Sequence, residues 1–129
     1  MDTSEKYVKM CSEATEIQNE TKLDDGDICQ CINKGDYYCH CGKVEVFNLL
    51  YSSNDRMFAK FNFIWLPRQD QLQEMIEKEG KVVNKLITLI HRFYCENETD
   101  YDSFEQLWLA FVMKEKYNKQ WNKEKLQWL

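Results

Sequence analysis

Four of the six cysteines of this chain fall in one short segment, CQCINKGDYYCHC, as two Cys-X-Cys pairs. Side chains two positions apart on a β-strand point to the same face of the sheet. If Lys34-Gly35-Asp36 forms the loop of a hairpin, Cys29 lies opposite Cys41 and Cys31 opposite Cys39, so that the four sulfurs share one face. A loop with an even number of residues would place the two pairs on opposite faces, because a shift by one residue reverses the orientation of a strand.

Three kinds of chemistry fit this cluster. Four thiolates, from Cys29, Cys31, Cys39 and Cys41, could hold a zinc ion, although typical structural zinc sites use a wider cysteine spacing. Cross-strand disulfides are a second interpretation, which the reducing cytosol opposes. We favour a third interpretation, in which reduced cysteines serve as small apolar strand residues. We therefore expect no cofactor, and the zinc-binding module, with zinc as its ion, remains an alternative.

The other residues that could carry chemistry are sparse. His91 and Cys95 stand at positions i and i+4 of an expected helix, so their side chains can meet. A nucleophilic cysteine needs that contact together with an orienting group and a cleft. We interpret Cys95 as a buried small residue and His91 as a surface residue. The sequence contains neither a glycine-rich phosphate loop nor a G-x-S-x-G elbow, and we therefore expect a protein that is not an enzyme.

Length and charge set further bounds. The chain has 129 residues, which suits a single domain covering 1–129. Its net charge of −5 argues against binding to the phosphate backbone of nucleic acids, which favours a positive surface. Residues 1–20 are polar and lack the apolar core of a secretory signal, and no apolar run approaches the length of a membrane span. We expect a cytoplasmic protein that does not enter a membrane.

Hydrophobic periodicity and turn residues predict the elements that position these groups. Expected helices cover 4–20, 67–77, 81–95 and 103–117, and expected strands cover 28–32, 37–41, 44–51 and 57–66. Gly26 supplies the backbone angle of a turn over 23–27, and Ser103 can cap the last helix. The tail, 121–129, is expected to add a helical turn or to fray. This order predicts an α+β fold: a small antiparallel sheet of three to four strands, with an N-terminal helix and two to four C-terminal helices packed on it.

The predicted core draws on the apolar faces of these elements. The first helix contributes a stripe at helical spacing, made of Tyr7, Cys11, Ala14 and Ile17. Trp65 and Trp108 stand within apolar periodic runs, so we expect both tryptophans in the core. A chain of this length can bury such a core without help from disulfides or a metal ion.

Three segments resemble a known group of proteins: KYVKMCSEATEIQ (6–18), WLPRQDQLQEM (65–75) and FEQLWLAFVMKEKYNKQWN (104–122). They are similar to segments of small uncharacterised proteins encoded by bacteriophages and prophages of Firmicutes. The resemblance implies a phage-derived origin and a cytoplasmic setting in an infected bacterial cell. It implies no chemistry, and the Cys-X-Cys pairs are not a feature of that group.

The C-terminal residues interleave basic side chains with aromatic rings. Lysines beside aromatic residues can bind single-stranded nucleic acid by charge and stacking, but Glu115 and Glu124 offset the positive charge here. Tryptophan is enriched among the anchors of protein interfaces, and Trp128, in a short tail, is a candidate for an exposed contact or a dimer seam. We therefore predict a partner-binding surface made of Tyr117, Trp121, Lys125 and Trp128.

These observations predict a small, acidic, non-enzymatic protein of phage or prophage origin that binds another protein in the bacterial cytoplasm. The expected partner is a host or phage protein, and origin, size and charge suggest interference with a host process. Two alternatives stay open. One is the zinc-binding module with its four-cysteine hairpin site, and the other is single-stranded nucleic-acid binding through the C-terminal lysine and tryptophan segment.

Overall fold

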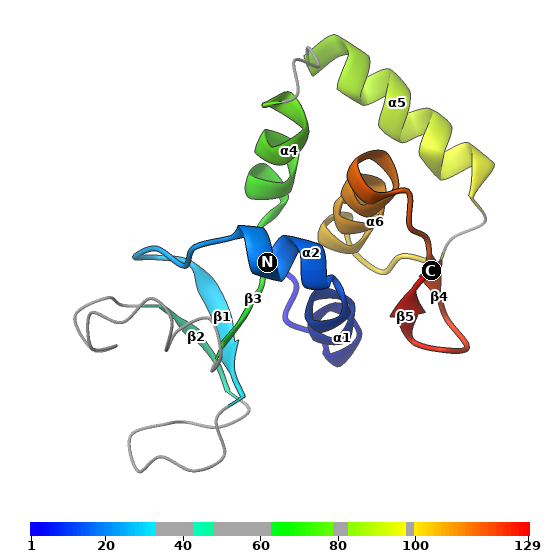
Figure 1. Ribbon diagram of the computed structural model, residues 1–129. Helices are drawn as coiled ribbons and strands as arrows, with labels where there is room; N and C mark the ends of the chain where they lie inside the picture. Colours follow the sequence, from blue (N-terminus) through cyan, green and yellow to red (C-terminus); the bar gives the residue numbers. More distant parts are fainter. Residues whose placement is uncertain (33–42, 48–62, 79–82, 98–99) are drawn as a thin grey trace, which may run out of the picture. The chain divides into compact units, whose positions relative to one another are not determined.

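The computed structural model describes residues 1–32, 43–47, 63–78, 83–97 and 100–129, and its helices and strands confirm the α+β class (Figure 1). The described chain divides into two compact units. Thr3–Pro67 forms the unit that holds the three-stranded sheet, and Arg68–Leu129 with Met1–Asp2 forms the unit that holds the C-terminal helices and a small hairpin. The single domain over 1–129 stays a prediction.

Two short helices open the sheet-bearing unit, where the sequence predicts one helix over 4–20. Helix α1 covers Glu5–Glu13 and helix α2 covers Thr15–Glu20. The helix breaks at Ala14, whose backbone angles are not helical. The Gln18 side-chain amide donates to the Cys11 carbonyl at 3.1 Å. This bond gives a carbonyl of the last turn of α1 a side-chain partner, which helps the helix to end there.

The apolar stripe predicted for the first helix is confirmed. Four of its side chains are 0% exposed: Tyr7, Cys11, Ala14 and Ile17. Helix α1 packs against α2 and against strand β3, Phe63–Trp65. The Tyr7 hydroxyl donates to the Pro67 carbonyl at 2.5 Å. The Gln18 amide pairs with the backbone of Trp65, accepting from its N–H at 3.0 Å and donating to its carbonyl at 2.9 Å, and these bonds tie the helices to the strand.

The sheet has three antiparallel strands in the order β2-β1-β3, within the predicted range. Strand β1 covers Ile28–Cys31, and strand β2 covers Val44–Val46. Cys29 lies opposite Glu45 of β2 on one side and opposite Trp65 of β3 on the other. Both edges of β1 are therefore occupied at Cys29, and Cys41, its partner in one of the two hairpin registers that the sequence leaves open, lies outside the described residues. The predicted strand 37–41 and most of the predicted strand 57–66 lie outside the described residues.

The predicted turn over 23–27 is confirmed and leads into β1. Gly26 has a φ of +87°, in the left-handed region that favours glycine. The Asp27 carboxylate accepts the backbone N–H of Asp24 at 2.9 Å, and the Asp27 N–H donates to the Asp24 carbonyl at 3.1 Å. The turn thus uses a glycine and a local aspartate side chain together, as such sequences predict.

Among the described residues of the second unit, three helices follow one another: α4 (Gln69–Glu77), α5 (Val83–Glu96) and α6 (Phe104–Tyr117). Helix α6 packs against both α4 and α5. Ser103 caps α6 as predicted, with its hydroxyl accepting the backbone N–H of Gln106 at 3.2 Å. Phe93 of α5 meets Phe111 of α6 edge to face, with ring centroids 5.6 Å apart.

Burial of the two central tryptophans follows the predicted apolar patterns. Trp65 is 6% exposed and Trp108 is 7% exposed, which confirms their expected place in the core. Gln106 is also buried, although it is polar, and its side chain is hydrogen-bonded. Within the part of the chain that the structure describes, none of the helices is both long enough and apolar enough to cross a membrane.

The C-terminal tail forms a small antiparallel hairpin, where the sequence predicts a helical turn or a frayed end. Strand β4 covers Trp121–Asn122 and strand β5 covers Gln127–Trp128. Gln120 and Leu129, just outside these strands, exchange both backbone hydrogen bonds, at 2.8 and 2.9 Å. The prediction for the tail is wrong because strands this short carry too little alternation to indicate β-structure.

Candidate functional site

The C-terminal hairpin is positioned by the way helix α6 ends. Asn118 adopts the left-handed conformation, with a φ of 54°, and its N–H donates to the Lys114 carbonyl at 3.0 Å. The next N–H along the chain, that of Lys119, donates to the Met113 carbonyl at 3.1 Å. These two bonds satisfy carbonyls of the last turn and reverse the chain direction, which brings Trp121 back towards the helix.

Two tryptophans pack on each other across the hairpin. The ring centroids of Trp121 and Trp128 are 5.0 Å apart, with 60° between the ring planes. Because Gln120 and Leu129 form the neighbouring hydrogen-bonded pair, the tryptophans occupy a non-hydrogen-bonded pair, where cross-strand side chains lie closest. Trp128 is 6% exposed, so the expectation that it makes an exposed contact is wrong, and Trp121 is the partly exposed member.

The other two residues of the predicted partner-binding surface lie at the hairpin or next to it in the chain. Lys125 is exposed in the connection between β4 and β5, and its backbone N–H donates to Asn122 Oδ1 at 2.7 Å. Tyr117 is the last residue of α6 and is partly exposed, with Lys116 Nζ 5.6 Å from its ring centroid. The structure therefore places three of the predicted residues on one hairpin and the fourth at the helix end before it.

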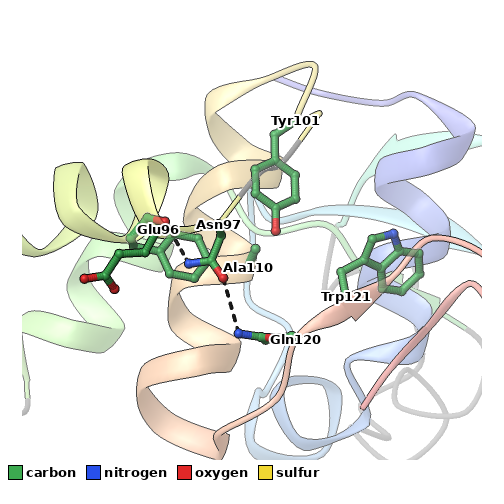
Figure 2. Close-up of a pocket in the computed structure, with 7 residues that line it drawn as sticks. Glu96, Asn97, Tyr101, Ala110, Gln120 and Trp121 are labelled. Atoms are coloured by element: carbon green, nitrogen blue, oxygen red, sulfur yellow. Dashed lines mark hydrogen bonds between the residues drawn. The ribbon is translucent and has the colours of Figure 1, made fainter.

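A pocket of about 370 Å³ lies beside the hairpin (Figure 2). Its walls come from the end of α5, the connection from α5 to α6, the middle of α6 and the start of the hairpin. The lining residues are Phe93, Glu96, Asn97, Tyr101, Ala110, Gln120 and Trp121. Trp121 is the one residue that belongs both to this lining and to the predicted partner-binding surface.

Two side-chain amides form a hydrogen-bonded relay in the pocket wall. Asn97 Nδ2 donates to the backbone carbonyl of Phe93 at 2.8 Å, and Gln120 Nε2 donates to Asn97 Oδ1 at 3.2 Å. A backbone carbonyl can only accept, so the carbonyl of Phe93 determines the orientation of both amides. Gln120 is left with one amide N–H and with its amide oxygen, which accepts no hydrogen bond from the described residues.

Tyr101 contributes a neutral hydroxyl to the same pocket. In Figure 2 this hydroxyl points into the space between Asn97 and Trp121. Burial raises the pKa of Tyr101 to about 12, so the hydroxyl keeps its proton at physiological pH. Within the described residues it has no hydrogen-bond partner. It can therefore both donate to a ligand and accept from one.

Glu96 is the one charged residue of the pocket lining. Glu96 is exposed, and in Figure 2 its carboxylate points away from the rings of Tyr101 and Trp121. Lys123 Nζ lies 2.6 Å from a carboxylate oxygen of Asp100. The seven lining residues include no basic side chain. The pocket thus combines aromatic rings with open hydrogen-bonding groups and has no basic side chain in its lining.

Cys29, the first residue of the predicted cysteine cluster, is a buried free thiol. It is 0% exposed and packs in a small apolar cluster with Phe47, Leu23 and Phe63. Burial, with the negative charges of Glu45 and Asp27 as smaller causes, raises the pKa of Cys29 to about 12. The interpretation of this cysteine as a reduced, small apolar strand residue is confirmed.

Cys31, the next cysteine of β1, is disulfide-bonded, so the same interpretation is wrong for it. A disulfide sulfur is not a thiolate, and a zinc site would need this bond to be reduced. In the described ranges no three His, Cys, Asp or Glu side chains gather in a way that could hold a metal ion. Cys39 and Cys41 lie outside the described residues, so the four-cysteine zinc site stays a prediction.

His91 and Cys95 meet on the surface of α5. Cys95 Sγ lies 3.8 Å from His91 Nε2, and both side chains are exposed. The interpretation of Cys95 as a buried residue is wrong, while that of His91 as a surface residue is confirmed. Neither residue lines the pocket, so the structure does not join this pair to the hairpin surface.

Most residues of the pocket carry no signal in the sequence. Asn97 and Tyr101 fall in a polar segment that indicates only a connection between helices. Gln120 reaches the relay because the chain reverses direction at Asn118, a feature that depends on a left-handed asparagine. Trp121 is the exception, because the lysines and aromatic residues at the end of the chain indicate a binding surface there.

Comparison of the chain with protein-family models, with curated proteins and with solved structures finds no match. The resemblance to phage and prophage proteins therefore stays a prediction that rests on the segments 6–18, 65–75 and 104–122.

Proposed function

We propose that this chain is a small, non-enzymatic protein of phage or prophage origin that acts in the bacterial cytoplasm by binding another protein, and so interferes with a host process. Its contact surface is the C-terminal hairpin together with the neighbouring pocket. The observation that supports this most directly is the position of Trp121, which is partly exposed, borders the pocket and packs on Trp128 at 5.0 Å.

A tryptophan held in place before binding suits the role of an interface anchor. Tryptophan dominates the binding energy of many interfaces, and its large ring buries much area at a low entropic cost. Ordering a side chain on binding costs about 0.5–1.5 kcal/mol, and a residue that is already packed on a neighbour avoids part of this cost. Trp128 and the hairpin backbone bonds therefore favour Trp121 as the anchor.

The same geometry favours a protein partner over single-stranded nucleic acid. Lys123 is paired with Asp100 at 2.6 Å, which removes one positive charge from the surface that a phosphate backbone would need. Trp121 and Trp128 face each other across the hairpin instead of presenting separate rings to successive bases. Nucleic-acid binding stays a prediction without further support.

The experiment that tests the proposal is affinity capture from a bacterial host lysate with the full chain, followed by quantitative mass spectrometry. A captured protein is then purified, and its dissociation constant is measured by titration calorimetry. We expect Trp121→Ala to weaken binding by about tenfold or more, as loss of an anchor does. The matched control is Phe104→Ala, which removes a 69% exposed aromatic side chain at the opposite end of α6.

Two results would count against the proposal. One is a partner that Trp121→Ala binds as tightly as the unmodified chain does. The other is an equal loss of binding in Phe104→Ala, which would indicate general stickiness of exposed rings. Thermal unfolding of each variant shows whether a loss of binding reflects a loss of the fold.

A further inference from the structure

The hydrogen-bonding groups left open in the pocket can accept from a ligand that donates. The relay that starts at the carbonyl of Phe93 leaves Gln120 with an amide oxygen, which can only accept. The Tyr101 hydroxyl has no partner among the described residues and can accept as well. A ligand rich in N–H groups finds two acceptors here, while the second N–H of Gln120 and the Tyr101 hydroxyl can also donate, so the choice between ligands depends on the walls of the pocket.

The walls of the pocket favour a cation. Three of the lining residues are aromatic, and Figure 2 shows Tyr101 and Trp121 bordering the same space. The face of an aromatic ring carries partial negative charge and attracts a cation placed over it. The lining includes no basic side chain that would repel a cation, and its one charged side chain, Glu96, is acidic although its carboxylate points away from the rings. The net charge of −5 acts in the same direction at longer range.

We propose that this pocket binds the guanidinium group of an arginine side chain that the protein partner presents, an inference that rests on the proposed function. A guanidinium group has five N–H donors and no acceptor, and its planar face stacks on aromatic rings. A lysine ammonium matches the charge but lacks the planar face. An anion finds no basic residue in the lining, and a neutral sugar or nucleobase gains nothing from the negative net charge of the chain.

The test uses two small probes of nearly identical shape on the full chain. N-acetyl-arginine amide carries the guanidinium group, and N-acetyl-citrulline amide replaces it with a neutral urea group. Binding is followed by nuclear magnetic resonance, from the backbone N–H signals of Gln120 and Tyr101 and from the indole N–H of Trp121. We expect saturable shifts with the arginine probe, with a dissociation constant of about 1 mM, as befits one isolated side chain. We expect binding of the citrulline probe to be about tenfold weaker, because charge-assisted hydrogen bonds are stronger.

Two variants test the residues that carry the inference. Tyr101→Phe keeps the ring and removes the hydroxyl, and Gln120→Ala removes the acceptor at the end of the relay. Each is expected to weaken binding of the arginine probe about tenfold, as loss of a hydrogen bond to a charged group does. Gln127→Ala, in the same hairpin but outside the pocket lining, is the matched control and should leave the affinity unchanged.

Equal affinity for the two probes would overturn the proposal, as would the absence of saturable shifts with the arginine probe. Tighter binding of adenosine or N-acetylglucosamine than of the arginine probe would overturn it too. If a variant fails to fold, the comparison of the two probes on the unmodified chain decides alone. A partner that depends on Trp121 while the arginine probe does not bind overturns this inference and leaves the proposed function standing. Binding of the arginine probe without any protein partner supports the guanidinium site and contradicts the proposed function.

Discussion

The Asp2 carboxylate accepts a hydrogen bond from the side-chain amide of Gln106 at 2.7 Å, across a separation of 104 positions in the chain. The same carboxylate oxygen accepts from the Ser103 hydroxyl at 2.5 Å, and Gln106 Oε1 accepts the backbone N–H of Asp102 at 3.2 Å. The N-terminal amine of Met1 lies 3.6 Å from a carboxylate oxygen of Glu105. The first two residues of the chain thus complete the start of helix α6, where a negative charge is favourable.

The variant Asp2→Ala tests this N-terminal contact. It leaves the buried Gln106 amide without the acceptor that it has in the native fold, and a buried donor left unpaired costs about 1–3 kcal/mol. We expect the free energy of unfolding to fall by that amount in urea titrations. Thr3→Ala, at an exposed neighbouring position, is the control and should change it little. Equal stabilities of the two variants would contradict the role of Asp2.

Gln18→Ala tests the side chain that joins α2 to β3. Its amide bonds both backbone groups of Trp65, at 2.9 and 3.0 Å, and the carbonyl of Cys11 at 3.1 Å. Removing the amide leaves three backbone groups without this partner, and we expect a loss of at least about 1–3 kcal/mol in the free energy of unfolding. Gln18→Met separates packing from hydrogen bonding because it keeps most of the side-chain volume. A Gln18→Met variant as stable as the unmodified protein would show that the hydrogen bonds matter little.

Thiol labelling should distinguish the three free cysteines that the structure describes. Cys95 is exposed, whereas Cys11 and Cys29 are 0% exposed, and the pKa of Cys29 is raised to about 12 by burial. Only the thiolate reacts with iodoacetamide, so we expect Cys95 to be modified first in the native protein. Peptide mass spectrometry follows each site over time, and Cys95→Ser should remove the fast phase. If Cys29 in the native protein were labelled as fast as Cys95, the Cys29 thiol would be neither buried nor raised in pKa.

The ionisation of Tyr101 gives a pH-dependent signature of the pocket. Burial raises the pKa of Tyr101 from 10.0 to about 12, so the native state keeps this proton when the unfolded chain has already lost it. This contribution to stability is complete below the unfolded pKa of 10.0 and is lost as the pH rises towards 12. Absorbance titration of phenolate in the protein and in Tyr101→Phe isolates the residue by difference. A difference curve centred near 10 would mean that the ring is hydrated.

The sequence by itself determined the features that depend on neighbours within a turn or two of the chain. Ser4 and Ser103 cap α1 and α6 through backbone N–H groups three residues further on. The turn at Gly26 is closed by the Asp27 carboxylate, which accepts the backbone N–H of Asp24, three residues earlier. Such contacts form between residues that are already close, so residue type and spacing are enough to predict them.

Only the tertiary structure decided which distant residues meet. Cys29 could pair with several strands of similar character, and its partners, Glu45 and Trp65, depend on which strands occupy the two edges of β1. The pocket likewise needs Tyr101 and Trp121 to be brought together by the chain reversal after α6. Contacts of this kind depend on the free energy of the whole fold. Periodicity along the chain indicates which residues are buried, but it does not indicate which residues they pack against.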